Sequence, residues 1–358
     1  MSLLHPITSP NETKLWNSIV KQSEALGFQQ VGVASTQLKE HIDRYKDWLD
    51  RGLNADLEYM SAHGSKRWVP EELIEGTLRV ISVRMDYLPE HVDKAEAQLS
   101  NPKAAYISRY TLGRDYHKLI RKRLKHLITF IREESENTLN FRAFVDSAPV
   151  LERAIAQKSG LGWFGKNTMI INRNAGSWFF LGEIYTDLAL PVSQEYTEEH
   201  CGSCTACLDI CPTNAFTGPY SLDTAKCISY LTIENKAEIP EHLRKQLGNR
   251  IFGCDDCQLV CPWNKFAKLS SEEDFSPRHN LDNATLVELF NWTEEEFLSR
   301  TEGSAIRRAG YIGWLRNIAV ALGNSPTSAP VIDALKSKSN HSSILVKEHV
   351  EWALKRHS

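Results

Sequence analysis

The pattern of apolar and polar positions predicts a mixture of helices and strands in the first part of the chain. Apolar residues recur at helical spacing between residues 14 and 26, and Gly27 then provides a common helix stop. Short apolar or alternating runs predict strands. On these patterns we expect helices at residues 14–26, 38–51, 116–133 and 150–159, and strands at residues 30–34, 79–85 and 141–145. Such a mixture predicts an α/β (α+β) domain.

The last part of the chain carries a helical pattern throughout. We expect helices at residues 312–322, 330–338 and 344–356, separated by Gly, Asn, Ser and Pro. An Ala-Leu pair ends two of these segments, at residues 321–322 and 353–354, about 32 residues apart. This spacing predicts a C-terminal HEAT-like α-helical repeat, and such repeats present concave binding surfaces.

All eight cysteines of the chain lie in one block, between Cys201 and Cys261. The N-terminus lacks the basic and apolar regions of a signal peptide, and no uncharged apolar run reaches about 18 residues. We therefore expect a cytoplasmic protein without a membrane span, in which the cysteine block binds metal instead of forming disulfides. The block also divides the chain into expected domains at residues 1–195, 196–268 and 269–358.

The spacing of the cysteines indicates which metal centre they bind. Residues 201–212 read C-x2-C-x2-C-x3-C-P, the bacterial ferredoxin run in which the fourth cysteine binds the other of two [4Fe–4S] clusters. A second run ends at Cys261 and Pro262, but Ile251 stands where its first cysteine would fall, which leaves Cys227 for that place. The sequence thus predicts one cluster on Cys201, Cys204, Cys207 and Cys261, and another on Cys211, Cys227, Cys254 and Cys257. Two four-cysteine zinc sites are the alternative, but they explain neither the third cysteine at equal spacing nor the two closing prolines.

The charge distribution is compatible with a nucleic-acid partner. The net formal charge of −3 excludes a uniformly basic surface, but residues 109–126 carry seven Lys and Arg against one acid. Residues 301–358 carry eight against four, with Arg307 and Arg308 adjacent and aromatic residues interleaved. Basic side chains bind phosphates and aromatic side chains stack on unpaired bases. A solvated helix face with tryptophans in the core explains the same residues without RNA.

Asp146 is the candidate acid of the first domain. It follows the expected strand 141–145 and precedes a helix that Pro149 introduces, and α/β domains place chemistry at such strand ends. The alternative is that Asp146 or Ser147 caps this helix. Three glycines then follow within residues 160–165, which lets the backbone approach a flat or bulky ligand, although a plain loop explains them too.

These segments together resemble the epoxyqueuosine reductase family. The resemblance is carried by residues 109–117, 146–152, 165–168, 227–234 and 254–264 together with the two cysteine runs, and it covers nearly the whole chain. It implies reduction of epoxyqueuosine to queuosine at the wobble position of certain tRNA anticodons. It also implies a base-off cobalamin in the N-terminal domain, next to one of the clusters. The common Asp-x-His-x-x-Gly cobalamin signature is absent, since Ile120 stands in the glycine position after Asp115 and His117; the family does not use that signature.

The resemblance also implies roles for individual residues. It makes Asp146 the proton donor to the leaving oxygen, and we expect burial against the corrin to raise its pKa. The implied surround of cobalamin consists of Arg67, Tyr110, Asp146, Lys166, Asn167, Ile170, Ser229 and Asp255. Arg307 and Arg308, with the helical tail, are expected to contact anticodon-loop phosphates. An external low-potential electron donor and a monomeric state complete the expectation.

Two other functions are compatible with parts of the sequence. One is a cobalamin and iron–sulfur reductase of a small epoxide or organohalide, but such a substrate needs no basic helical tail. The other is a non-enzymatic iron–sulfur electron carrier, but a carrier needs no domain of about 195 residues before its clusters.

Overall fold

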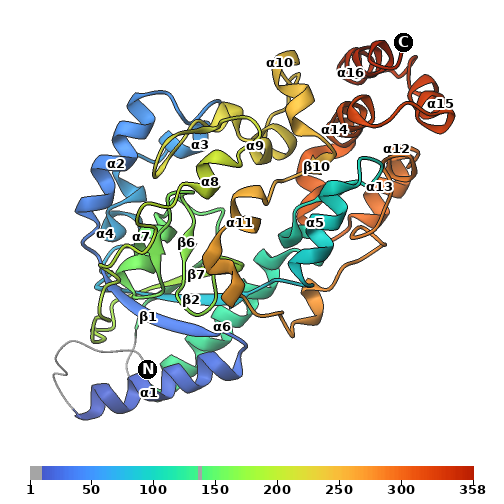
Figure 1. Ribbon diagram of the computed structural model, residues 1–358. Helices are drawn as coiled ribbons and strands as arrows, with labels where there is room; N and C mark the ends of the chain where they lie inside the picture. Colours follow the sequence, from blue (N-terminus) through green and yellow to red (C-terminus); the bar gives the residue numbers. More distant parts are fainter. Residues whose placement is uncertain (1–9, 136–138) are drawn as a thin grey trace.

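A four-stranded antiparallel sheet organises the first part of the molecule (Figure 1). The computed structural model describes residues 10–135 and 139–358, so the N-terminus that we judged for a signal peptide lies outside the described residues. The strands are β1 (Gln30–Ser35), β2 (Arg79–Asp86), β4 (Phe141–Phe144) and β7 (Phe179–Thr186), in the order β1-β2-β7-β4. Small two-stranded pairs accompany it, among them β5 (Trp163–Phe164) with β6 (Ile170–Ile171) and β8 (Phe216–Gly218) with β9 (Ser221–Leu222).

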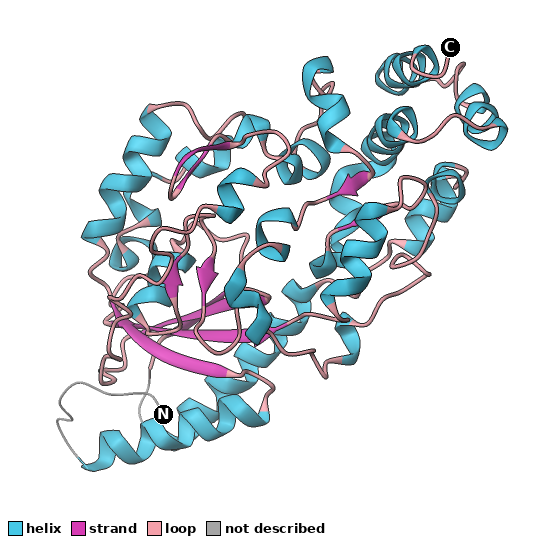
Figure 2. Ribbon diagram, viewed as in Figure 1, coloured by secondary structure: helices cyan, strands magenta, loops and turns pink. Residues whose placement is uncertain are grey.

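Helices cover both faces of this sheet (Figure 2). Because side chains alternate along a strand, Ile81 and Ile184 pack with Leu124 of α6 (Tyr116–Ser135) on one face, where α1 (Pro10–Ala25) also lies. On the other face, Tyr185 packs with Ile155 of α7 (Glu152–Lys158). The end of α7 comes so close to β1 that a Cβ on Gly32 would lie 1.9 Å from the carbonyl oxygen of Ser159.

The helices and strands expected from the periodicity are present, with bounds that differ by a few residues. The periodicity missed β7, one of the two central strands of the sheet. This strand is buried on both faces, so apolar and polar residues do not alternate along it, and even its one acid, Glu183, is buried. Also missed were α5 (Val92–Ser100), α12 (Leu286–Phe290) and α13 (Glu294–Arg300).

The end of the chain is helical, as expected, and lies at the far end of the molecule from α1 (Figure 1). It contains α14 (Gly310–Asn324), α15 (Ala329–Ser337) and α16 (Ile344–Lys355). The helices α14 and α16 pack closely, since a Cβ on Gly323 would lie 2.6 Å from the Trp352 side chain. The HEAT-like repeat stays a prediction. No helix of the described ranges is long and apolar enough to cross a membrane.

The cysteine block is anchored to the segments on either side of it. Its short helices are α8 (Ala206–Asp209), α9 (Ile228–Ile233), α10 (Glu241–Arg244) and α11 (Asp256–Leu259), and β10 (Arg250–Phe252) pairs in parallel with β3 (Tyr106–Ile107). Buried Arg316 of α14 donates hydrogen bonds to the carbonyl oxygens of Leu231 and Asn235. The core therefore crosses residues 195 and 268, and the domain boundaries stay predictions.

Short elements complete the chain. The helical ones are α2 (Lys39–Asp50), α3 (Glu58–Ser61), η1 (Gly64–Arg67), α4 (Pro70–Leu73), η2 (Arg109–Thr111), η3 (Thr224–Lys226), η4 (Lys245–Leu247), η5 (Pro262–Phe266), η6 (Glu273–Phe275) and η7 (Ala305–Ala309).

Candidate functional site

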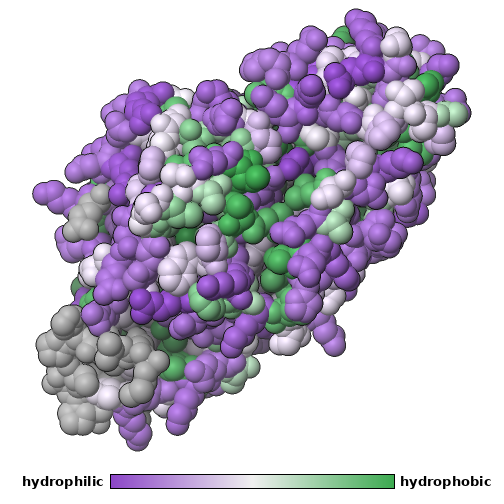
Figure 3. Space-filling view, in the orientation of Figure 1, coloured by the Kyte–Doolittle hydropathy of each residue, from purple (hydrophilic) through white to green (hydrophobic). Residues whose placement is uncertain are grey.

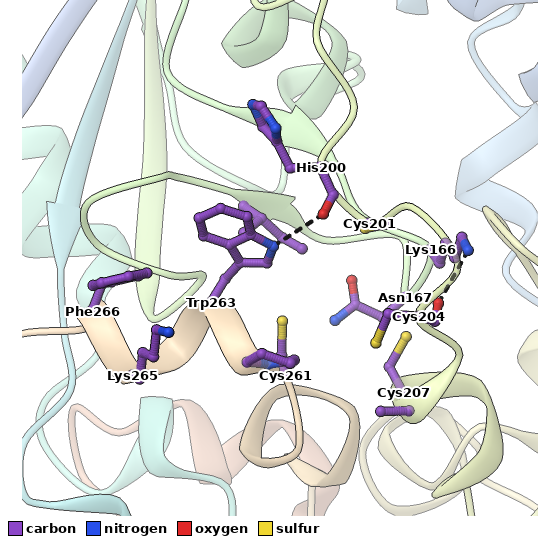
Figure 4. A pocket seen from close by; sticks show the side chains of 13 residues that line it. Lys166, Asn167, His200, Cys201, Cys204, Cys207, Cys261, Trp263, Lys265 and Phe266 are labelled. Carbon is purple, nitrogen blue, oxygen red and sulfur yellow. Dashed lines mark hydrogen bonds between the residues drawn. The ribbon is translucent and has the colours of Figure 1, made fainter.

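Four of the cysteines line one cavity of about 310 Å³. They are Cys201, Cys204, Cys207 and Cys261, and Figure 4 shows the sulfur atoms of the last three facing the same space. Lys166 holds the loop of Cys204, because its Nζ donates hydrogen bonds to the carbonyl oxygens of Gly202 and Cys204 at 2.5 and 3.0 Å. Burial and then the neighbouring thiols raise the pKa of Cys207 to about 11. Four thiols share this space, and Cys204 is exposed on its rim.

The other four cysteines come together from separate segments. Cys227 precedes α9, Cys254 and Cys257 stand at α11, and Cys211 follows α8. Burial raises the pKa of Cys257 and the charge of Cys227 adds to the effect, while Cys211 acts in the same way on Cys227. All eight thiols are free, and within the described ranges no group of three or more His, Cys, Asp or Glu lies close enough to hold a single metal ion.

Ile251 shows why the second run lacks its first cysteine. Its side chain is fully buried in β10, within the core that joins the cysteine block to the helical end. A cysteine there would point into this core. Cys227, from a separate segment, is therefore the cysteine that remains for this ligand position.

Asp146 lies in the loop that leaves β4, with its side chain 52% exposed. Its backbone adopts a φ of 51°, a left-handed conformation that is uncommon for a residue with a Cβ. Two side chains from the start of α6 hold its carboxylate: the hydroxyl of Tyr116 donates to Oδ2, and Nε2 of His117 lies 3.1 Å from the same atom. The capping alternative is wrong, because α7 begins at Glu152 and Leu151 occupies the cap position.

The hydrogen bonds at Asp146 reverse the expected direction of its pKa. Burial raises this pKa, but the hydrogen bonds from His117 and Tyr116 outweigh burial and lower it below its usual value. The rise in pKa expected from burial against the corrin stays a prediction for the cobalamin-loaded protein. Burial lowers the pKa of His117, but its hydrogen bonds to Asp115 and Asp146 outweigh burial and raise that pKa to about 9.

Tyr110 connects this acid to the rest of the expected cobalamin surround. Its ring lies edge-on to the rings of Tyr116 and Phe180, and after burial the charges of Asp146 and Asp255 raise its pKa most. Asp255 itself is buried and accepts hydrogen bonds from the Tyr106 hydroxyl and the Arg109 backbone amide, both at 2.8 Å, and from the Ser108 hydroxyl.

The remaining expected contacts lie beside the cysteines or belong to other segments of the first part of the chain. Asn167 donates from Nδ2 to the carbonyl oxygen of Cys257 at 3.3 Å, and Ser229 hydrogen-bonds to Cys227. Ile170 of β6 is buried in a small apolar cluster. Arg67 is buried, and Nη2 donates to the carbonyl oxygen of Tyr59.

Arg307 and Arg308 both lie exposed in η7. Arg307 donates from Nη2 to the carbonyl oxygen of Leu298 at 2.6 Å. Arg308 forms an ion pair with Glu234, and its positive charge contributes to the lowered pKa of Asp146. The helical end of the chain thus presents a cation toward the candidate acid.

Sequence reasoning missed two partners of Asp146, His117 and Tyr116. Both stand in a segment that carries the family resemblance, but no spacing rule joins them to a residue 29 or 30 positions later. The pairing of β4 with β7 and the packing of α6 on both strands bring them together.

Comparisons with known proteins bear on the whole chain. Residues 67–147 match the family described as "Epoxyqueuosine reductase QueG, DUF1730", and residues 200–264 match the 4Fe-4S double cluster binding domain. The epoxyqueuosine reductase of Pseudomonas aeruginosa is 59% identical over 351 residues, which cover 98% of this chain and 97% of that protein. The chain belongs to the epoxyqueuosine reductase family. The epoxyqueuosine reductase of Escherichia coli is 56% identical over 329 residues, covering 92% of this chain and 86% of the relative.

Solved structures of epoxyqueuosine reductases share the fold. A crystal structure of one with an epoxyqueuosine-modified tRNA-Tyr stem loop has a TM-score of 0.85 and 25% identity, and covers 97% of this chain and 91% of that chain. The Bacillus subtilis epoxyqueuosine reductase, with its catalytic aspartate loop swung out of the active site, has a TM-score of 0.84 and 25% identity over the same shares. The expected family, the double-cluster region and the helical C-terminal region are confirmed.

Proposed function

We propose that this chain reduces epoxyqueuosine to queuosine in the wobble position of tRNA anticodons, and that it does so in the cytoplasm, where tRNA is modified. The observation that carries the proposal is the identity of 59% with a reductase of this family over nearly the full length of both chains. The stem loop bound to a relative of the same fold supports the choice of substrate.

The eight cysteines would hold two [4Fe–4S] clusters. One set is Cys201, Cys204, Cys207 and Cys261, and the other is Cys211, Cys227, Cys254 and Cys257. The cavity that the first set lines supports this division, because four thiols facing one space suit a cubane. The effects of Cys211 and Cys227 on neighbouring thiols support the second set.

Cobalamin would lie between Asp146 and the second cysteine set, which contains Cys257. Its expected surround includes Tyr110, which senses the charge of Asp146, and Asn167, which contacts Cys257. Arg67 fits a large polar cofactor, since its buried Nε has no hydrogen-bond partner among the residues that the structure describes. An amide or phosphate oxygen of the cofactor would supply the acceptor that this atom lacks. When bound, cobalamin would supply a strongly reducing centre.

The residues of the chain then supply binding and protons. Removing the epoxide oxygen needs two electrons, two protons and cleavage of carbon–oxygen bonds. We assign the proton donor to Asp146, and its carboxylate, which two side chains orient, supports this role. Its loop corresponds in role to the catalytic aspartate loop named for the Bacillus subtilis relative.

Arg307, Arg308 and the helical end would contact the phosphates of the anticodon loop. Arg308 supports this placement, because its charge acts on Asp146 and it therefore lies on the side of the acid. The electrons would come from an external low-potential donor protein, and we expect the enzyme to act as a monomer.

The experiment that tests this function compares two substrates. The protein is purified without oxygen and loaded with iron, sulfide and cobalamin. It is then given a low-potential reductant and either an epoxyqueuosine-modified stem loop or a small epoxide. We expect queuosine in the stem loop and no turnover of the small epoxide. Turnover of the small epoxide alone would favour the small-substrate reductase, and turnover of neither would favour the electron carrier.

A further inference from the structure

We propose that His117, oriented by Asp115, holds the proton that Asp146 delivers to the leaving oxygen. This inference rests on the proposed function, and it deepens the role of the same site. His117 acts through Asp146 and is therefore a positioning and proton-loading residue. The role of Asp146 as proton donor does not by itself require a role for His117.

The geometry places both ring nitrogens of His117 against carboxylate oxygens. Nδ1 lies 2.7 Å from Oδ1 of Asp115, and Nε2 lies 3.1 Å from Oδ2 of Asp146. The backbone amide of His117 also donates to Oδ1 of Asp115 at 3.0 Å, which fixes that carboxylate. A neutral imidazole carries one N–H, so one nitrogen lone pair would face an anionic oxygen; the imidazolium satisfies both contacts.

The ring has little freedom to leave this position. Tyr116 stacks on Phe180 with ring centroids 3.8 Å apart, and the His117 ring stacks on Tyr116 at 4.2 Å. Only 23% of the His117 side chain is exposed, which is enough contact with solvent to take up a proton. The arrangement thus combines a fixed orientation with a route for reloading.

The charges around His117 favour its protonated form. The acids that act on it are Asp115 from its own loop, Asp146 from the loop after β4 and Glu152 from α7. The opposing cations are more remote: Lys118 acts on Asp115, and Arg308 of η7 acts on Asp146. The pKa of His117 is about 9 and that of Asp146 is below its usual value, so at neutral pH the proton rests on the imidazole.

One proton passes from His117 through Asp146 to the leaving oxygen. Opening of the epoxide breaks a carbon–oxygen bond, and the bonding pair stays on the oxygen. The proton on Nε2 of His117 passes to the carboxylate of Asp146, and Asp146 gives a proton to that oxygen. His117 is left neutral, with Nδ1–H still donated to Asp115, and it takes the next proton from water. The electrons come from the low-potential reductant that the family's activity already requires.

The test is the pH dependence of single-turnover reduction of the modified stem loop. For the wild type we expect the rate to fall as pH rises through about 9, where His117 loses its proton. His117→Gln should lower the single-turnover rate constant by about 10²-fold and abolish this limb, with stem-loop affinity unchanged. Asp115→Asn should move the limb to lower pH, because it removes the charge that stabilises the imidazolium.

Controls separate this role from a structural one. All variants should keep wild-type iron, cobalamin and stem-loop affinity, and His91→Gln, at an exposed histidine that starts α5, should match the wild type throughout. A His117→Gln enzyme with a wild-type rate and an unchanged alkaline limb would overturn the proposal. So would a loss of rate matched by an equal loss of stem-loop affinity.

The outcome is distinguishable from failure of the proposed function. If the wild type makes no queuosine while it retains iron and cobalamin, the function fails. If wild type makes queuosine and Asp146→Asn does not, but His117→Gln behaves as wild type, only the inference about His117 fails.

Discussion

The electron side and the proton side of this molecule are built in different ways. On the electron side, eight cysteines within residues 201–261 provide every expected cluster ligand, and short turns between them set most of the geometry. On the proton side, Asp146 depends on Tyr116 and His117, which start α6, a helix that packs on β4 and β7. Thiolate ligation tolerates a mobile backbone because metal bonds order it. A proton relay has no such bond, so the sheet and α6 must already hold its groups.

The strongest way to break the electron side alone is Cys204→Ala. We expect the iron content to fall from that of two clusters to that of one, and queuosine formation to be lost, because a cubane needs its four thiolates. Iron analysis of the protein loaded without oxygen measures this. Ser203→Ala, at the exposed neighbouring residue, should retain both clusters. Unchanged iron, or zinc in its place, would contradict the cluster assignment.

A smaller effect is expected on the affinity for the tRNA stem loop. Replacing Arg307 and Arg308 together with glutamine should raise the stem-loop Kd by roughly tenfold. The slope of its salt dependence should flatten by about one unit for each phosphate that the variant no longer binds. Titration at several salt concentrations measures both. Lys21→Gln on α1, at the other end of the molecule, should change neither. Equal Kd values for the double variant and the wild type would move the binding surface elsewhere.

The smallest expected effect is on thermal stability, and it concerns a buried acid near Asp146. Glu183 of β7 is fully buried, and within the described part of the chain neither carboxylate oxygen has a hydrogen-bond partner. Burial, then Glu152 and Asp146, raise its pKa well above 4.5. The folded state therefore binds a proton that the unfolded state releases, and stability falls as pH rises from 4.5.

Glu183→Gln removes this loss of stability. We expect the Tm at about pH 8 to rise by on the order of a few degrees, and the gain to shrink as pH falls toward the ordinary carboxyl value, where both side chains are neutral. Thermal melts at several pH values measure it. A gain that grows as pH falls would contradict the account, because it would require Glu183 to be ionised in the fold.

The hydropathy of the surface does not distinguish the electron side from the proton side. In the space-filling view of Figure 3, apolar patches occur between hydrophilic regions over the middle of the face. The exposed apolar residues include Ile210, next to the cysteine run, and Phe266, which lines the cavity of Cys204. Composition alone therefore does not separate a cluster rim from an ordinary surface.

Features that depend on residues close together in the sequence could be predicted, and features that depend on distant residues could not. Helices such as α6 are visible because their apolar faces repeat every turn, and the cysteine spacing is local. The strand β7 was not predicted, because burial on both faces removes the alternation of apolar and polar residues. The contacts of Asp146 with His117, and the pairing of β3 with β10, join residues far apart in the chain, and no local pattern encodes them.

The measurement that tests the separation of the two sides most directly is oxygen removal by Asp146→Asn. The loaded variant and the wild type are given the same epoxyqueuosine-modified stem loop and reductant, and the nucleoside is followed by mass spectrometry. We predict that the variant keeps wild-type iron, cobalamin and stem-loop Kd but forms queuosine about 10²- to 10⁴-fold more slowly. A rate near that of the wild type would contradict the assignment of Asp146 as the proton donor.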